Sequence, residues 1–138
     1  MPISNQAGLG LCHALAHALG GAFHVPHGRL NAILLPAVLD CNATAAMEQY
    51  AAMARAAGFS ASSDVMALRA MRNGLISLRR ELGLPQTLSQ AGVDPRKIRE
   101  QEQKIVEAAL QDPCCETNPV KPEAHMIRTI LAGVMGRG

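Results

Sequence analysis

The chain has 138 residues, of which 49% are apolar and 17% are charged. This length suffices for one compact domain and is too short for two, so residues 1–138 are expected to form a single domain. Thirteen Lys and Arg against eleven Asp and Glu give a net charge of +2, and the sequence contains one Tyr, two Phe and no Trp. Because a large basic field and aromatic stacking platforms are both missing, we expect no nucleic-acid partner.

The uncharged N-terminal stretch raises the question of a membrane or secretion segment, since the first basic residue is Arg29. A signal peptide begins with basic residues, which this stretch lacks. A spanning helix would have to bury three histidines and cross Gly20-Gly21 and Pro26, so we expect no membrane partner. The four cysteines show no CxxC pairing, which favours free thiols in a reducing cytoplasm.

The alanine-rich composition, with few β-branched runs, predicts an all-α fold, a helical bundle of about six to seven helices. In chain order, the expected helices cover residues 5–19, 28–42, 44–58, 64–82, 95–112 and 122–134, with a single helical turn at 87–90. Gly20-Gly21 is expected to stop the first helix, and Pro36 to kink the second near Ile33. N-caps are expected within residues 62–64 and at Asp94.

Four of the five histidines lie within fifteen residues, at His13, His17, His24 and His27, in a segment without a carboxylate. His13 and His17 are about one helical turn apart and share a face. The turn around Pro26 allows the chain to fold back and bring His27 toward that face. Because imidazole is a common ligand of transition metals, the cluster indicates a metal site. The alternative is a set of hydrogen-bonded core histidines.

Other catalytic motifs are missing from the sequence. A zinc peptidase requires HExxH, whereas residues 13–17 read HALAH and lack the glutamate that serves as general base. Gly8-Leu9-Gly10 does not follow a predicted strand and is not a dinucleotide fingerprint. A stand-alone zinc hydrolase would need a general base beside His17, and the candidates Asp40 and Glu48 lie too far along the chain.

Residues 7–21 read AGLGLCHALAHALGG and are followed by PHG at 26–28 and NAILLP at 31–36. This run resembles the signature of the iron-containing alcohol dehydrogenases, GxxHxxAHxxGxxxxxPHGxxNAxxLP, and meets every fixed position between Gly10 and Pro36. Residues 114–119, CCETNP, are similar to the closing segment of that family. The Cys before the first histidine and the phrase FHVPHGR at 23–29 resemble members from propanol and ethanolamine pathways.

The resemblance implies the helical C-terminal domain of the dehydroquinate synthase-like fold, without its cofactor domain. It implies that His13 and His27 bind the catalytic Fe²⁺, or Zn²⁺ in some members. It also implies that His17 is a catalytic and cofactor-binding residue beside nicotinamide and substrate. The implied reaction is hydride transfer between a small alcohol or aldehyde and NAD(P). The two other metal ligands, an Asp and a His four residues later, are expected upstream of Met1, because the sequence has no DxxxH.

With two ligands and no nucleotide domain, the chain alone is expected to bind metal weakly and to have no turnover. If helices upstream of Met1 are missing, the uncharged face of residues 5–19 is expected to be partly exposed. This exposure favours a homo-oligomer or pairing with the missing cofactor domain. The alternative is a non-catalytic helical binding module that keeps the family's fold.

Overall fold

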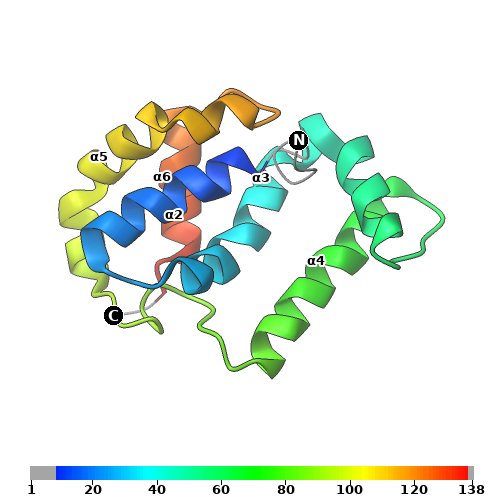
Figure 1. The fold of residues 1–138 in the computed structure, drawn as a ribbon, viewed down its shortest axis with the longest axis horizontal. Coiled ribbons are helices and arrows are strands. Elements are labelled where there is room, and N and C mark those ends of the chain that lie inside the picture. The colour runs from blue at the N-terminus through cyan, green and yellow to red at the C-terminus, as the bar shows by residue number, and fades with distance from the viewer. Residues whose placement is uncertain (1–8, 137–138) are drawn as a thin grey trace.

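The computed structural model describes residues 9–136, and all regular secondary structure in this part of the chain is helical (Figure 1). The elements are α2 (Gly10–Phe23), α3 (His27–Ala56), α4 (Asp64–Glu81), α5 (Pro95–Gln111), the 3-10 helix η1 (Pro113–Thr117) and α6 (Ala124–Val134). The all-α prediction is confirmed. The two helices predicted at 28–42 and 44–58 are joined in α3, and a kink with non-helical dihedrals at Ala46 divides this element close to the predicted boundary. The expected helical turn at 87–90 is wrong, because these residues form a non-helical turn.

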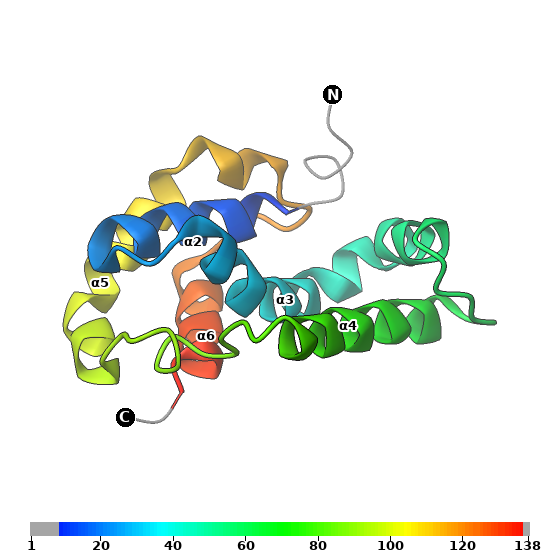
Figure 2. The ribbon, with the colours of Figure 1, turned by 60° about the horizontal axis from the view of Figure 1, so that its bottom comes forward.

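Two hydrophobic clusters make up the core. The larger joins α2, the first part of α3, residues 88–93, α5 and α6, and the smaller joins the second part of α3 to α4. Figure 2 shows α4 running along α3, on the side away from α5. In α2, Leu11, Leu15 and Leu19 have no exposed surface. The domain therefore covers the apolar face of residues 10–19 by itself, and the expectation that this face is partly uncovered is wrong for these residues. Residues 5–8 lie outside the described part.

Two N-caps predicted from the sequence are confirmed. The Ser63 hydroxyl accepts a hydrogen bond from the Met66 amide at 3.2 Å, and Asp94 accepts one from the Arg96 amide at 2.9 Å. In the turn at 87–90, Thr87 accepts from the Gln90 amide at 3.1 Å. Such bonds satisfy amides that have no partner inside a helix or turn. They fix where α4 and α5 begin.

The expected kink near Ile33 is wrong. Within α3, Ala46 is the residue with non-helical dihedrals, ten residues beyond Pro36. Pro36 has no amide hydrogen, so the carbonyl oxygen of Ala32, four residues earlier, loses its helical partner. The Arg79 guanidinium of α4 donates to that oxygen at 3.0 Å. A neighbouring helix thus satisfies the carbonyl that the proline leaves free, and the helix continues through Pro36.

α3 is also long and apolar enough, by length and composition alone, to cross a membrane. The core helix of a folded domain passes the same test, so this property is weak evidence for a membrane span. Leu30, Leu34 and Val38 of this helix have no exposed surface and belong to the larger core cluster.

The predicted glycine stop of α2 is also wrong. The helix passes through Gly20-Gly21 and ends at Phe23, and His24 adopts the left-handed conformation with φ 57°. The amide of His24 donates to the carbonyl oxygen of Gly20 at 3.0 Å. Glycine permits a left-handed stop without requiring one. Because α3 has Pro26 as its N-cap, the turn falls just before that proline and His24 has to take the left-handed position.

The bond between Arg79 and Ala32 predicts a stability coupling. We expect Arg79→Met to lower the free energy of unfolding by about 1–2 kcal/mol, because a partly buried carbonyl loses a charged donor. In a Pro36→Ala background the alanine amide can bond to Ala32, so the same substitution should cost much less. Urea denaturation of the four proteins of this double-mutant cycle measures the coupling. Equal costs of Arg79→Met in both backgrounds would contradict this account.

The backbone of His24 predicts a stabilising substitution. A left-handed non-glycine residue costs about 1–2 kcal/mol, so His24→Gly should raise the free energy of unfolding by about 1 kcal/mol. Ala22→Gly, two residues earlier and inside the helix, is the matched control and should lower stability. Thermal and urea unfolding of both variants provide the comparison. A destabilised His24→Gly would show that the imidazole makes a contact worth more than the backbone strain.

Candidate functional site

Three imidazoles meet on one face of the domain. His13 and His17 come from α2 and His27 is the first residue of α3, so the short link at 24–26 brings the two helices together. The ring centroids of His13 and His27 are 6.2 Å apart with planes inclined by 6°, and those of His17 and His27 are 5.5 Å apart. His17 and His27 are exposed, and His13 is half-buried. The cluster therefore lies open to solvent at the surface.

The separation of His13 and His27 is close to that of two ligands on a shared ion. With metal–nitrogen bonds of about 2.0–2.1 Å, two imidazoles on one tetrahedral ion have ring centroids about 5.2 Å apart. The observed 6.2 Å is about 1 Å wider, so the two side chains have to rotate toward each other to share an ion. Neutral imidazole nitrogens also suit Fe²⁺ and Zn²⁺. The donor chemistry of this pair thus fits a divalent transition metal after that rotation, with further ligands from elsewhere.

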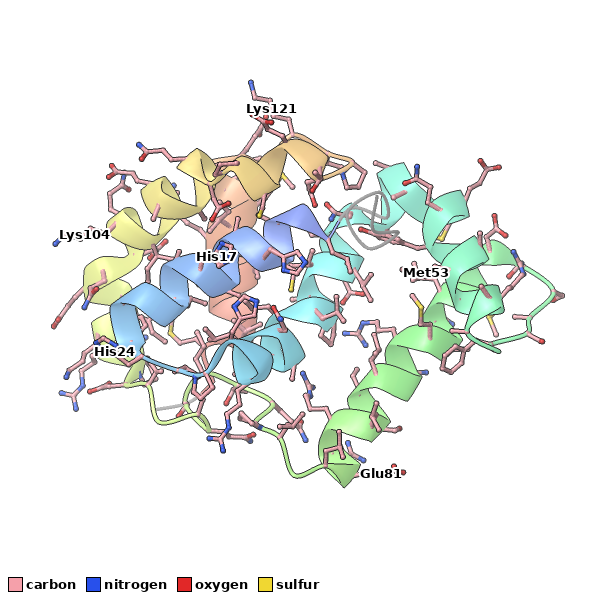
Figure 3. All side chains as sticks on the ribbon, in the orientation of Figure 1. His17, His24, Met53, Glu81, Lys104 and Lys121 are labelled. Atoms are coloured by element: carbon pink, nitrogen blue, oxygen red, sulfur yellow. The ribbon has the colours of Figure 1, made fainter. Side chains whose placement is uncertain are left out.

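His24 does not join the cluster. Figure 3 shows His17 in the middle of α2 and His24 at its C-terminal end. The His24 side chain is exposed and lines a pocket together with Phe23, residues 92–94 before α5, and Lys97 of α5. Of the four clustered histidines in the sequence, His13, His17 and His27 lie close together, and His24 is the C-cap residue of α2.

A carboxylate completes the group around His17. Asp112, the residue that ends α5, places Oδ2 2.8 Å from Nδ1 of His17. The sequence predicts Asp112-Pro113 only as the end of a helix, and it rejects Asp40 and Glu48 as partners of His17 because they lie too far along the chain. The structure agrees for Asp40, which pairs with Nε of Arg72 at 2.8 Å. The signal available in the sequence was an aspartate at a helix end, directly before the family-like closing segment.

The Asp112 carboxylate is held from two sides. Its Oδ1 accepts the backbone N–H of Cys114 at 2.8 Å, while Oδ2 faces His17. Burial pushes the carboxyl pKa upward, but the hydrogen bonds from Cys114 and His17 outweigh burial and hold the pKa of Asp112 below its usual value. Asp112 is therefore ionised at neutral pH. With an N–H on Nδ1 donated to Asp112, the Nε2 atom of His17 remains available on the exposed side of the ring.

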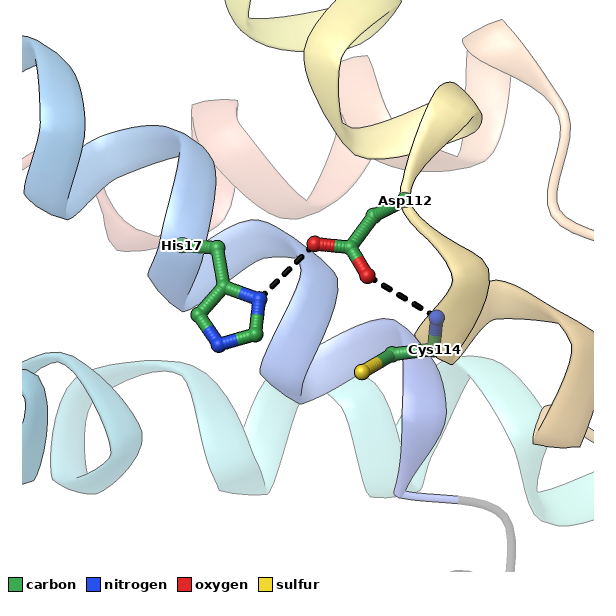
Figure 4. Close-up of side chains that lie close together, drawn as sticks. All are labelled: His17, Asp112 and Cys114. Carbon is green, nitrogen blue, oxygen red and sulfur yellow. Dashed lines mark hydrogen bonds and ion pairs between the residues drawn. The ribbon is translucent and has the colours of Figure 1, made fainter.

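Cys114 lies beside this pair. One donor atom each from His17, Asp112 and Cys114 lie within 4.8 Å of one another, and Figure 4 shows the three side chains together. Burial and the adjacent Asp112 raise the pKa of the Cys114 thiol. The thiol is therefore protonated in the absence of a bound cation.

The closing segment is anchored to α3 by a pair of amides. Asn118 donates to Oδ1 of Asn42 at 3.0 Å and accepts from Nδ2 of the same residue at 2.8 Å. Asn42 is fully buried and also donates to the Tyr50 hydroxyl at 3.2 Å. Because a buried amide left without partners is costly, this pair fixes where residues 113–119 lie.

Comparison with known proteins identifies the domain. The profile described as "Fe-containing alcohol dehydrogenase family, C-terminal" matches residues 3–135. This chain belongs to the iron-containing alcohol dehydrogenase family. It is 38% identical over 131 residues to the 1-propanol dehydrogenase of Salmonella typhimurium, which covers 92% of this chain and 35% of that protein. It is 34% identical over 119 residues to the NADPH-dependent butanol dehydrogenase of Clostridium saccharobutylicum, which covers 86% and 30% respectively.

Solved structures agree with this assignment. A 1,3-propanediol oxidoreductase superposes with a TM-score of 0.81 at 31% identity, covering 91% of this chain and 32% of the other. An alcohol dehydrogenase from Oenococcus oeni gives a TM-score of 0.78 at 30% identity, covering 92% and 32%. The resemblance seen in the sequence, including that to propanol dehydrogenases, is thus confirmed. The chain spans about a third of the length of these relatives.

Gly10, which opens the family signature, allows η1 to lie against α2. A Cβ atom at this position would collide with the backbone oxygen of Cys114 and with Oγ1 of Thr117. The glycine therefore serves a close approach between two backbones. Because η1 lies this close to α2, Asp112 and Cys114 lie next to His17.

We expect Gly10→Ala to lower the free energy of unfolding by about 1–3 kcal/mol, because a backbone oxygen cannot move aside as a flexible side chain can. The same change should weaken the hydrogen bond between His17 and Asp112, which ¹⁵N NMR of the His17 ring detects. Gly21→Ala is the matched control in the same helix, since a Cβ there meets nothing within 4 Å. This control should be neutral or stabilising. Identical behaviour of the two variants would argue against a close approach at Gly10.

Proposed function

We propose that this chain is the metal- and substrate-binding part of an NAD(P)-dependent alcohol dehydrogenase, with residues 1–138 forming its single helical domain. The observation that carries the proposal is the meeting of His13 and His27. Fourteen residues apart in the sequence, they come within 6.2 Å on the open face that also carries His17. The residues match the family signature and their geometry suits the chemistry implied by it.

In this proposal His13 and His27 supply two ligands to Fe²⁺, or to Zn²⁺, and the other ligands come from outside the chain. When bound, such an ion acts as a Lewis acid on the alcohol or aldehyde oxygen, while NAD(P) exchanges the hydride. The half-buried position of His13 and the exposed position of His27 leave the ion reachable by a substrate from the solvent side.

His17 is the proposed catalytic residue and also the one that contacts the nicotinamide cofactor. With its Nδ1–H donated to Asp112, its Nε2 can accept or return the hydroxyl proton of the alcohol. Asp112 is then a positioning residue, because it fixes the tautomer and the orientation of the ring. In this proposal His13 and His27 bind the metal, and His17 accepts and returns the proton.

The substrate class follows from the relatives. Their names specify 1-propanol, butanol and 1,3-propanediol, which supports a small alcohol or its aldehyde as the substrate here. The four cysteines are free thiols, which supports the cytoplasm as the proposed location. Leu78 of α4 and Leu82, directly after that helix, are 50% and 63% exposed, and we propose that a cofactor domain or a second copy of the chain covers them.

The test pairs these 138 residues with the N-terminal portion of a relative. We expect the chain alone to show no turnover, and the chain co-expressed with the N-terminal portion of the Salmonella typhimurium 1-propanol dehydrogenase to retain metal and reduce propanal with NAD(P)H. His13→Ala and His27→Ala should each abolish metal retention, measured by elemental analysis after anaerobic purification. His17→Ala should retain metal and lose most of the rate.

His125→Ala is the matched control, because its side chain is 74% exposed and lies on α6, and it should change neither quantity. A folded complex without metal and without turnover would contradict the proposal. It would favour the alternative, a non-catalytic helical binding module that keeps the family's fold. Metal retention that survives both His13→Ala and His27→Ala would contradict the ligand assignment.

A further inference from the structure

The side chains of His17, Asp112 and Cys114 form a second group of metal donors, separate from the proposed ligands His13 and His27. One donor atom from each of the three lie within 4.8 Å of one another. We propose that this trio is a binding site for Zn²⁺ or a similar borderline transition-metal ion. The site uses donors from two elements that are far apart in the sequence.

The donor set selects the kind of ion. An imidazole nitrogen, a carboxylate oxygen and a cysteine sulfur are all common zinc ligands, and a thiolate does not suit Mg²⁺ or Ca²⁺. Bonds of about 2.0–2.3 Å require donor atoms about 3.3–3.7 Å apart in a tetrahedral site. His17 and Asp112, now 2.8 Å apart, need to separate by less than about 1 Å to admit the ion.

The surroundings hold two of the donors in place. Oδ1 of Asp112 accepts the Cys114 amide at 2.8 Å, so the carboxylate presents its other oxygen to His17. Ligating carboxylates that are themselves hydrogen-bonded are typical of metal sites, because such bonds orient the ligand. The glycine at position 10 sets the approach of η1 to α2. The site therefore requires rotation of side chains and no movement of an element.

The site has three protein donors and an open side. The side chain of His17 is 53% exposed and that of Asp112 is 15% exposed, so the fourth position of a tetrahedral ion faces solvent and takes water. Binding replaces the S–H bond of Cys114 by a metal–sulfur bond and releases that proton to solvent. The proton on Nδ1 of His17 is exchanged through solvent to Nε2 of the same ring, so one proton is released in total. No electron transfer is involved.

Occupation of this site has a consequence that rests on the proposed function. An ion on Nδ1 of His17 replaces the N–H that Asp112 receives, and the ring proton then lies on Nε2, which can no longer accept the hydroxyl proton of the alcohol. Zinc at this site should therefore inhibit the assembled enzyme without displacing the metal at His13 and His27. Inhibition by free Zn²⁺ would be relieved by a chelator.

The test titrates the reduced chain with Co²⁺ under anaerobic conditions. A cobalt–thiolate bond gives a charge-transfer absorption in the near ultraviolet, which imidazole ligands alone do not give. We expect this absorption in the wild type, its removal by excess Zn²⁺ and its loss in Cys114→Ser. His17→Ala and Asp112→Asn should each weaken Co²⁺ affinity by more than about tenfold.

Cys115→Ser is the matched control, because the Cys115 thiol donates to the carbonyl oxygen of Ala109 at 3.0 Å and is not one of the three donors. This variant should keep the absorption, and so should His13→Ala and His27→Ala. These last two variants separate this site from the proposed catalytic metal, which has no thiolate. An absorption that is missing in the wild type, survives Cys114→Ser or disappears in Cys115→Ser overturns the proposal.

A second measurement uses the wild-type chain alone, in case Cys114→Ser does not fold. Alkylation by iodoacetamide, mapped by mass spectrometry, should become at least about tenfold slower at Cys114 when Zn²⁺ is added, because a coordinated thiolate is shielded. The rate at Cys115 should not change. Equal alkylation of Cys114 with and without Zn²⁺ overturns the proposal.

Discussion

The placement of α2 governs every part of the candidate site. Its apolar side is fully buried, so the helix cannot rotate without exposing leucines that the core encloses. Burial of that side leaves His13 and His17 on the opposite, accessible side. The short link at 24–26 then starts α3 with His27 beside them. The imidazole cluster is thus a consequence of core packing together with a turn of fixed length.

The same helix receives the end of α5. Gly10 permits η1 to approach closely, and the Asn42–Asn118 amide pair holds the far end of that segment against α3. Asp112 lies directly before η1, the segment that both restraints hold. Its distance from His17 therefore depends on contacts made along the 3-10 helix, and the pair forms although its members are 95 residues apart in the chain.

Local signals in the sequence predicted local structure well. Ser63 and Asp94 are capping residues whose bonds involve amides two or three residues away, and both helices begin where expected. The predictions of a helix end at Gly20-Gly21 and of a kink near Ile33 caused by Pro36 are wrong, because the effects of these residues depend on the surrounding tertiary structure. Pro26, the N-cap of α3, follows two residues after His24, where α2 ends. Arg79 from α4 donates to the carbonyl oxygen of Ala32, which Pro36 leaves without a helical partner.

The site was predictable to the extent that it is local. The spacing of His13 and His17, the turn before His27 and the family signature together pointed to the three rings that meet. Asp112 could not be assigned to His17 in this way, because no periodicity links α2 to the end of α5. The sequence excludes Asp40 as a partner of His17, and Asp40 pairs with Arg72 on α4, but the sequence contains no local signal that assigns Asp112 in its place.

The pairing of His17 with Asp112 is compatible with two roles for His17, proton transfer in the dehydrogenase reaction and binding of Zn²⁺ together with Cys114. A carboxylate that is held by a backbone amide and aimed at Nδ1 stabilises a positive charge between the two side chains. The charge can be carried by a proton, which leaves Nε2 for substrate, or by a metal ion, which recruits Cys114 as well. The two states exclude each other, because both need the same nitrogen. The chemistry at His17 is therefore set by which cation that nitrogen holds.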